Sequence, residues 1–174
     1  MFFVTITDRR GEAMERLWSP WRMEYIMSKK GEGCIFCEKI ADNDDESNYI
    51  LHRGKKCYLM LNLYPYNNGH LMISPYQHVS SLEQLEEDVL TEMMLMVNRS
   101  LRALRRAMHP DGFNVGINIG KAAGAGIEKH IHIHIVPRWN ADTNFMPVFS
   151  QTRVIPELLD ETYQKLKDAW EESE

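Results

Sequence analysis

The most constraining feature of this chain is an alternating stretch, His130-Ile131-His132-Ile133-His134-Ile135-Val136. Successive side chains of a β-strand point to opposite faces. We therefore expect a strand over residues 129–136, with its three histidines on one face and its three isoleucines on the other, buried face. Three of the seven histidines fall within these five residues. Packing alone does not account for that density, so the histidine face is predicted to carry chemistry.

The rest of the chain predicts an α+β fold built on an antiparallel sheet of about five strands. Further strands are expected over residues 49–52, 56–61, 69–74 and 113–119, separated mostly by turns. Apolar residues at helical spacing predict a short helix and then a long one that ends before Pro110. Ser80 and Ser81, with Glu83 and Gln84, are candidate capping boxes for that stretch. A short helix is expected over residues 34–40, and an amphipathic C-terminal helix from Pro156 onward.

Length and charge limit the organisation and the partners. With 174 residues, the chain is expected to form one domain with a real core. We assign residues 1–16 to a flexible N-terminal tail and residues 17–174 to the domain, with a core at 34–138 and a C-terminal extension at 139–174. The 20 basic and 25 acidic side chains give a net charge of −5, which argues against a protein that coats nucleic acid. No run approaches the ~20 apolar residues of a membrane span, and a cytoplasmic location is expected.

The three cysteines divide into a pair and a single residue. Three cysteines cannot all pair within one chain, and two of them form Cys34-x-x-Cys37. This pattern favours a reducing compartment and a metal or redox role over a secreted disulfide framework. Cys57 lies within a predicted strand and is expected in the core.

Two chemical interpretations of the histidine face compete. Neutral imidazole is a common metal ligand, and zinc accepts three of them. Alternatively, one imidazole acts as a nucleophile that its neighbours position. The Gly/Ala-rich stretch at residues 120–126 precedes the histidines, and such a loop lets backbone N–H groups approach anionic oxygens. The loop therefore favours phosphate chemistry beside the histidines.

These motifs together resemble the histidine-triad (HIT) superfamily, whose pattern is His-φ-His-φ-His-φ-φ with φ apolar. Residues 130–136 match it in full, and the resemblance extends from Cys34 to Arg138. Further matches are Cys-x-x-Cys, Asn62, Gly-His-Leu-Met-Ile-Ser-Pro at 69–75, His78 and Asn118. The segments at 17–22, 122–126 and 137–147 resemble the bacterial branch of diadenosine tetraphosphate phosphorylases.

The resemblance implies an enzyme with a nucleotidyl-histidine intermediate. The middle histidine, His132, would attack the α-phosphorus of an adenine nucleotide or dinucleoside polyphosphate, and water or inorganic phosphate would release AMP or ADP. His134 would hydrogen-bond the α-phosphate. Asn118 and the loop amides around Gly124 and Gly126 would hold phosphoryl oxygens. Asn62 would contact the ribose hydroxyls.

The resemblance also implies a structural zinc and a homodimer or higher homo-oligomer. Cys34, Cys37, His78 and His130 would form a Cys₂His₂ site with all four positions filled. The alternative is that Cys34 and Cys37 are ordinary reduced thiols. No organic cofactor is implied. The subunits would join their sheets edge to edge.

Several alternatives stay open at this stage. The chain is also compatible with a dinucleoside polyphosphate hydrolase, a nucleoside phosphoramidase, a nucleotide-binding module with weak catalysis or a catalytic metal site at the triad. Many family members carry Gln-Ser where this chain has Gly126-Ile127. Assistance to the leaving group would then come from backbone amides, Lys129, Arg138 or Asn144. The other histidines considered, His52, His70 and His109, are expected to be structural or exposed.

Overall fold

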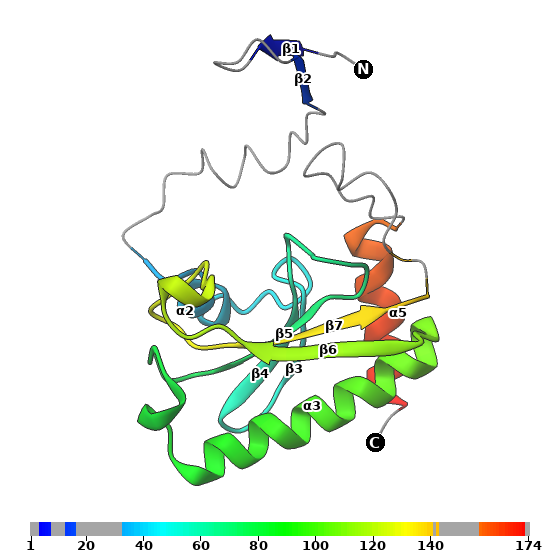
Figure 1. Cartoon of the computed structure of the whole chain (residues 1–174). Coiled ribbons are helices and arrows are strands. Elements are labelled where there is room, and N and C mark those ends of the chain that lie inside the picture. The colour runs from blue at the N-terminus through cyan, green and yellow to red at the C-terminus, as the bar shows by residue number, and fades with distance from the viewer. Residues whose placement is uncertain (1–3, 8–12, 17–32, 141, 143–156, 173–174) are drawn as a thin grey trace.

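The structure is a computed structural model that describes residues 4–7, 13–16, 33–140, 142 and 157–172. Its centre is a five-stranded antiparallel sheet in the order β3-β4-β5-β7-β6 (Figure 1). The strands are β3 (Ile50–Arg53), β4 (Cys57–Leu61), β5 (Leu71–Pro75), β6 (Gly112–Ile117) and β7 (Ile133–Arg138). The predicted α+β fold with five strands is confirmed.

Helices cover both faces of this sheet. The long helix α3 (Glu87–Met108) packs on β4, β5 and β7, and the C-terminal helix α5 (Leu159–Glu171) packs on α3 and β3. The short helix α2 (Ile35–Ala41) lies over the opposite face (Figure 1). Two single-turn helices, η1 (Leu82–Gln84) and η2 (Lys121–Ala123), lie in the connections before α3 and after β6.

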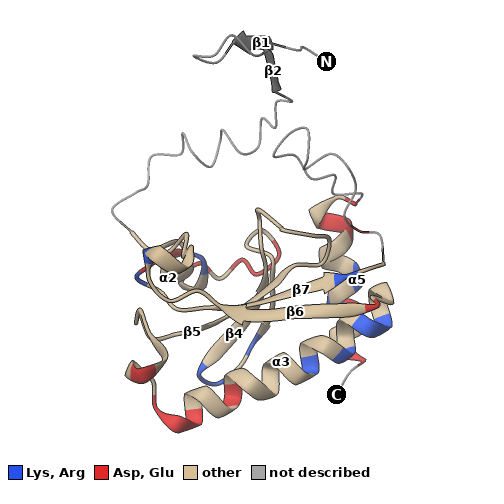
Figure 2. Ribbon diagram, in the orientation of Figure 1, with Lys and Arg blue, Asp and Glu red and all other residues tan. Residues whose placement is uncertain are grey.

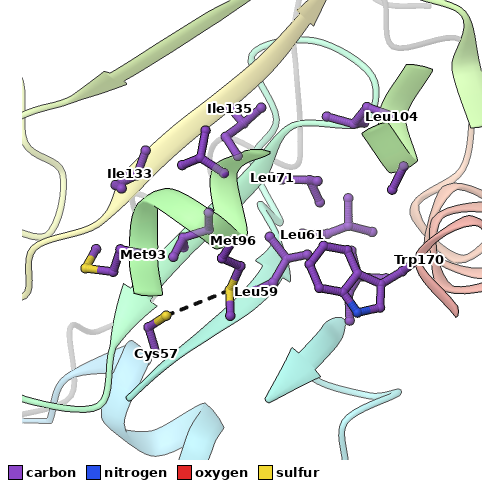
Figure 3. Close-up of a cluster of buried hydrophobic side chains, with 14 of the residues drawn as sticks. Cys57, Leu59, Leu61, Leu71, Met93, Met96, Leu104, Ile133, Ile135 and Trp170 are labelled. Atoms are coloured by element: carbon purple, nitrogen blue, oxygen red, sulfur yellow. Dashed lines mark hydrogen bonds between the residues drawn. The ribbon is translucent and has the colours of Figure 1, made fainter. Parts of the chain in front are cut away.

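The alternation of the strands divides the apolar side chains into two clusters. Leu59, Leu61, Ile133 and Ile135 point toward α3 and α5, where they meet Met93, Met96, Leu104 and Trp170 (Figure 3). Cys57 is fully buried in this cluster, as its place in a strand predicted. The second cluster gathers Phe36 of α2 with Ile50, Tyr58, Met60 and Met72 on the opposite face. Each face of the sheet therefore carries an apolar cluster of its own.

The start of α3 differs from the predicted capping boxes. The helix begins at Glu87 with Glu86 as its N-cap, and Glu86 makes no side-chain cap bond. Gln84 instead accepts a hydrogen bond from the backbone N–H of Ser80 (3.0 Å), beside the single turn η1. Ser80 and Gln84 bond to each other beside that turn, so they do not cap the long helix. The predicted end is confirmed, because His109 caps the helix in a left-handed conformation directly before Pro110.

The charges of α3 follow its dipole. Acidic residues lie in its first turn, and Arg105 and Arg106 lie in its last turn (Figure 2). Arg105 stacks over the Phe113 ring at 5.0 Å, and Arg106 pairs with Glu172 at 3.0 Å. These basic side chains therefore have partners within the fold.

Helix α5 is fastened to the domain by side chains along its length. The hydroxyl of Tyr163 donates to the carbonyl of Ile50 (3.1 Å), and Lys167 donates to the carbonyl of Leu51 (3.0 Å). Near its C-terminal end, the Arg99 guanidinium lies 4.1 Å from the centre of the Trp170 ring. The C-terminal helix is thus an integral layer of the domain.

The N-terminal segment contributes a small sheet of its own. Strands β1 (Val4–Thr7) and β2 (Ala13–Arg16) pair with each other in antiparallel fashion. None of the helices in the described part of the chain is long and apolar enough to cross a bilayer. Pro156, the expected first residue of the C-terminal helix, lies outside the described residues, and the helix begins at Leu159.

Candidate active site and metal site

The three triad histidines lie where the chain enters β7, and the predicted strand boundary at 129 is wrong. The ladder with β5 and β6 begins only at Ile133. Upstream of it, the N–H of Ile131 donates to the carbonyl of Val79 (2.7 Å), and Ser74 Oγ donates to the carbonyl of Ile131 (3.2 Å). These bonds replace the ladder and keep the alternation. Ile131, Ile133 and Ile135 belong to the α3 side of the core, as predicted.

His132 is held with one ring nitrogen engaged. Its Nδ1–H donates to the carbonyl of His130 at 2.8 Å. In the neutral ring this leaves Nε2 with the lone pair. Phe36 packs against the ring at 4.7 Å between centroids, and His134 meets it edge-on at 4.7 Å. His132 is 5% exposed. The ring is fixed in orientation, and the backbone decides which of its nitrogens keeps the lone pair.

His134 is oriented by a histidine that the sequence assigned to structure. Nε2 of His70 lies 2.9 Å from Nδ1 of His134. The other nitrogen of His70, Nδ1, accepts the backbone N–H of Tyr66 at 3.1 Å and the amide of Asn62 at 3.2 Å. His70 must then carry its proton on Nε2 and donate it to His134. As a result, neutral His134 carries its own proton on Nε2.

Burial keeps these rings neutral at pH 7. The pKa of His70 is lowered to about 3, chiefly by desolvation and to a lesser extent by the nearby His134 and His132. Desolvation and the nearby His132 lower the pKa of His134 to about 4. Burial also lowers the pKa of His132, although the hydrogen bond to the carbonyl of His130 acts in the opposite direction and raises this pKa. A neutral His132 is the form that can act as a nucleophile.

The predicted metal ligands meet in space. One donor atom from each of Cys34, Cys37, His78 and His130 lies within 4.8 Å of the other three. The closest approaches are 3.3 Å from Cys34 Sγ to His130 Nδ1 and 3.3 Å from Cys37 Sγ to His78 Nδ1. Ligands bound tetrahedrally to zinc at about 2.0–2.3 Å stand roughly 3.3–3.8 Å apart. The cluster therefore fits zinc with small adjustments.

His130 has the hydrogen bonding expected of a metal ligand. Its Nε2–H donates to the carbonyl of Pro75 at 2.9 Å, which leaves the lone pair on Nδ1 facing the two sulfur atoms. Metal-bound histidines usually donate their second ring N–H in this way. The same residue offers its carbonyl to His132, so the Cys/His cluster and His132 share one stretch of backbone.

The remaining predicted contacts lie around this centre. Asn62 reaches it through His70, and its Oδ1 accepts the N–H of Tyr64 at 2.9 Å. Asn118 follows β6 and is half-buried, while Gly124 and Gly126 are exposed in the loop before the triad. In the part of the chain that the structure describes, none of these three makes a hydrogen bond to His132. The structure joins Asn62 and His134 directly to the His70 system and leaves the loop apart.

The loop amides are partly occupied within the loop. The N–H groups of Ala123 and Ala125 donate to the carbonyl of Gly120, and that of Gly124 donates to the carbonyl of Lys121. Gly124 has a φ of 88°, which glycine adopts readily. Phosphate binding by the loop would require some of these bonds to be exchanged.

The candidates for leaving-group assistance differ in their surroundings. Lys129 is exposed. Arg138 forms a two-point ion pair with Asp142 at 2.6 and 2.7 Å. Its guanidinium is therefore already engaged within the fold. Asn144 lies outside the described residues, as do Trp18 and Trp21 of the N-terminal motif.

Sequence reasoning missed two residues that contact the triad. His70 is expected from the sequence to be structural or exposed, and Phe36, an unassigned position of Cys34-x-x-Cys37, is given no role there. The pattern that points to His70 is its place in Gly69-His70-Leu71, at the turn into β5, because β5 pairs directly with β7. Spacing alone does not reveal it, since His70 and His134 are 64 residues apart.

Comparison with known proteins gives the family. A model of the HIT domain matches residues 44–141. The chain belongs to the HIT family. An AP-4-A phosphorylase of Mycobacterium tuberculosis is 39% identical to it over 95% of this chain and 91% of that protein. The resemblance seen in the triad motif is confirmed.

Solved HIT structures share the fold. A zinc-bound histidine triad family protein from Mycobacterium smegmatis superposes with a TM-score of 0.65 at 29% identity, covering 80% of this chain and 94% of that one. A histidine triad nucleotide-binding protein from Sulfolobus tokodaii gives 0.62 at 29% identity, covering 80% and 91%. The HIT match at 44–141 includes His70 and the triad. It leaves Cys34, Cys37 and helix α5 outside.

Proposed function

We propose that this chain is a nucleotidyl-transferring HIT enzyme that splits diadenosine tetraphosphate, with inorganic phosphate as the acceptor. The observation that carries the proposal is the neutral His132, whose Nδ1–H is committed to the carbonyl of His130 and whose Nε2 is thereby left nucleophilic. The 39% identity to a protein named AP-4-A phosphorylase, across 95% of this chain, supports this choice of substrate.

In the first step, Nε2 of His132 attacks the α-phosphorus of one adenosine end. A phosphorus–nitrogen bond forms, the bond from that phosphorus to the bridging oxygen breaks, and ATP leaves. This divides one difficult displacement into two easier ones. The bond from Nδ1–H to the carbonyl of His130 becomes stronger as the ring gains positive charge, so it stabilises the intermediate.

His134 serves the same step as a hydrogen-bond donor. Because His70 donates to its Nδ1, its Nε2–H is directed outward and can donate to an oxygen of the α-phosphate. Donors that are already oriented before charge develops contribute most to the rate. Asn62, Asn118, Gly124 and Gly126 would bind the ribose and the phosphoryl oxygens.

In the second step, an oxygen of inorganic phosphate attacks the same phosphorus, and the bond to His132 breaks. The products are ADP and the regenerated neutral histidine. Incubation with diadenosine tetraphosphate and phosphate should yield ADP and ATP in equal amounts. Product formation that is unchanged when phosphate is omitted, with AMP in place of ADP, would favour the hydrolase alternative.

Two further alternatives remain. A nucleotide-binding module with weak catalysis predicts tight binding of AMP with no turnover under either condition. The phosphoramidase alternative predicts release of AMP from an adenosine phosphoramidate faster than from diadenosine tetraphosphate. Product analyses with these two substrates, together with a measurement of AMP binding, separate the four possibilities.

Zinc is the proposed structural ion. Cys34, Cys37, His78 and His130 would hold it, and when bound it would cross-link α2 to the backbone that precedes β7. All four ligand positions are supplied by protein side chains, which is typical of structural sites. The zinc-bound relative from M. smegmatis supports the choice of metal.

The proposed assembly is a homodimer joined at β6. This strand lies at the edge of the sheet, and its central residues Asn114, Val115 and Gly116 are exposed. An unpaired edge strand is a template for pairing with a second chain. Light scattering should give twice the mass of the chain, and the monomer mass would contradict the assembly. We also propose a cytoplasmic location. The proposed domain comprises residues 17–174, and residues 1–16 form a tail.

A further inference from the structure

The turn that presents His70 has a defined geometry. Residues 67–70 form a four-residue turn in which the N–H of His70 donates to the carbonyl of Asn67 at 3.3 Å. Gly69, the third residue, has a φ of 70°, a conformation that turns of this kind assign to glycine. The position of His70 against His134 therefore depends on where this turn is held.

One side of the turn is tied to the triad strand. Asn67 Nδ2 donates to the carbonyl of Pro137 at 3.1 Å and to Asp142 Oδ2 at 2.9 Å. Pro137 lies in β7, the strand that carries His134. Arg138 in turn fixes the carboxylate of Asp142. The first corner of the turn thus moves with β7.

The other side is tied to the C-terminal segment. Asn68 Nδ2 donates to Glu157 Oε2 at 2.9 Å. The hydroxyl of Thr162 donates to the same carboxylate at 2.8 Å and lies 3.1 Å from Asn68 Oδ1. Lys165 pairs with the second carboxylate oxygen. Thr162 is 1% exposed. The second corner is therefore held by polar contacts from α5 and from Glu157, two residues before that helix.

We propose that Glu157 and Thr162 are positioning residues for catalysis, because they hold Asn68 and so keep His70 at hydrogen-bond distance from His134. The inference rests on the proposed function. It assigns a catalytic purpose to residues that lie outside the matched HIT domain at 44–141. A displacement of about 1 Å at a catalytic group can lower a rate by roughly 100-fold, so a remote clamp of this kind is effective.

The test compares variants that weaken the contacts to the turn with variants that spare them. Glu157→Ala and Thr162→Val loosen the turn, whereas Glu157→Gln still accepts from Asn68. Tyr163→Phe is the matched control, since it removes a bond from α5 to β3 and touches nothing in the turn. We expect Glu157→Ala to lower kcat by about 10-fold with KM within about twofold, as for other outer-shell partners. Glu157→Gln and Tyr163→Phe should keep near-normal kcat.

A second readout does not depend on turnover. The Nε2–H proton of His70 is buried and hydrogen-bonded, and its exchange with water can be followed by proton NMR. We expect Glu157→Ala to speed this exchange by about 10-fold or more, and Tyr163→Phe to leave it unchanged. Unchanged exchange in Glu157→Ala, or equal losses of kcat in Glu157→Ala and Tyr163→Phe, would overturn the inference.

The two proposals fail in different ways. If the wild-type chain turns over no dinucleoside polyphosphate while Glu157→Ala still alters the His70 proton, the proposed function fails and the clamp on His70 stands. If the wild-type chain is active and Glu157→Ala matches it in kcat and in proton exchange, the positioning role alone fails.

Discussion

His70 Nε2 donates to His134 Nδ1 across 2.9 Å, and the backbone N–H of Tyr66 determines this direction from the far side of the His70 ring. A main-chain amide can only donate, so no rearrangement of protons reverses the pair without breaking a bond. The tautomer of His134 is thus determined two hydrogen bonds away, at the backbone of Tyr66.

Replacement of His70 should impair chemistry more than binding. In His70→Ala, His134 loses the donor that fixes its tautomer, and we expect kcat to fall by roughly 10- to 100-fold with little change in KM. His109→Asn is the matched control, because His109 is an exposed helix cap in the left-handed conformation that asparagine tolerates. Steady-state kinetics of both variants measure the effect. A His70→Ala enzyme as fast as His109→Asn would exclude the role.

The acid side of the pH–rate profile should lie well below the ordinary histidine range. Burial lowers the pKa of His134 to about 4, and protonation of its Nδ1 would break the bond from His70. Burial lowers the pKa of His132 as well, so we expect kcat/KM to hold where a free histidine titrates and to be lost as the pH approaches 4. Circular dichroism at each pH separates this from unfolding. An acid midpoint near 6.5 would contradict the buried neutral pair.

Stability should decrease in acid because of His70. Its pKa is depressed to about 3 in the fold, against an ordinary value of 6.5. Above pH 6.5 the His70 ring is neutral in both the folded and the unfolded chain. Below pH 6.5 the ring binds a proton in the unfolded chain but not in the folded one. The free energy of unfolding should then fall by up to about 1.4 kcal/mol per pH unit from this residue, until about pH 3. Urea unfolding of His70→Asn should show a shallower pH dependence than the wild type; equal slopes would argue against it.

Loss of a cysteine ligand should release the metal and loosen α2. We expect about one zinc per wild-type chain and little in Cys37→Ala, with a lower melting temperature. Cys57→Ala is the control, because Cys57 lies in the core away from the cluster and should cost stability without costing zinc. Elemental analysis and thermal melts of the three proteins give the answer. Equal zinc in wild type and Cys37→Ala would remove Cys37 from the site.

The alternation at residues 130–136 was sufficient to predict which side chains enter the core. Its period of two separated the isoleucines, which lie in the apolar cluster against α3, from the histidines on the opposite face. Burial does not distinguish the two sets, because His130, His132 and His134 are buried as well. The resemblance carried the metal cluster, whose four members come from three separate segments.

The sequence could not predict what depends on register and on single hydrogen bonds. The strand boundary at Ile133 arises because Ile131 bonds to Val79 of a distant loop. The role of His70 arises because β5 pairs with β7 in the register Met72 to His134. Neither relationship leaves a periodic trace in the chain, so both appear only in three dimensions.

His132 is proposed to carry the nucleotidyl group during turnover. The most direct test is to trap this covalent nucleotidyl-histidine. The enzyme is mixed with diadenosine tetraphosphate in the absence of phosphate and quenched within one turnover. Its peptides are then analysed by mass spectrometry. We predict a mass gain of one AMP on the peptide that contains His132, formed together with ATP, converted to ADP by added phosphate and absent from His132→Ala. Product formation in a single turnover without this adduct, or an adduct that persists in His132→Ala, would contradict the mechanism.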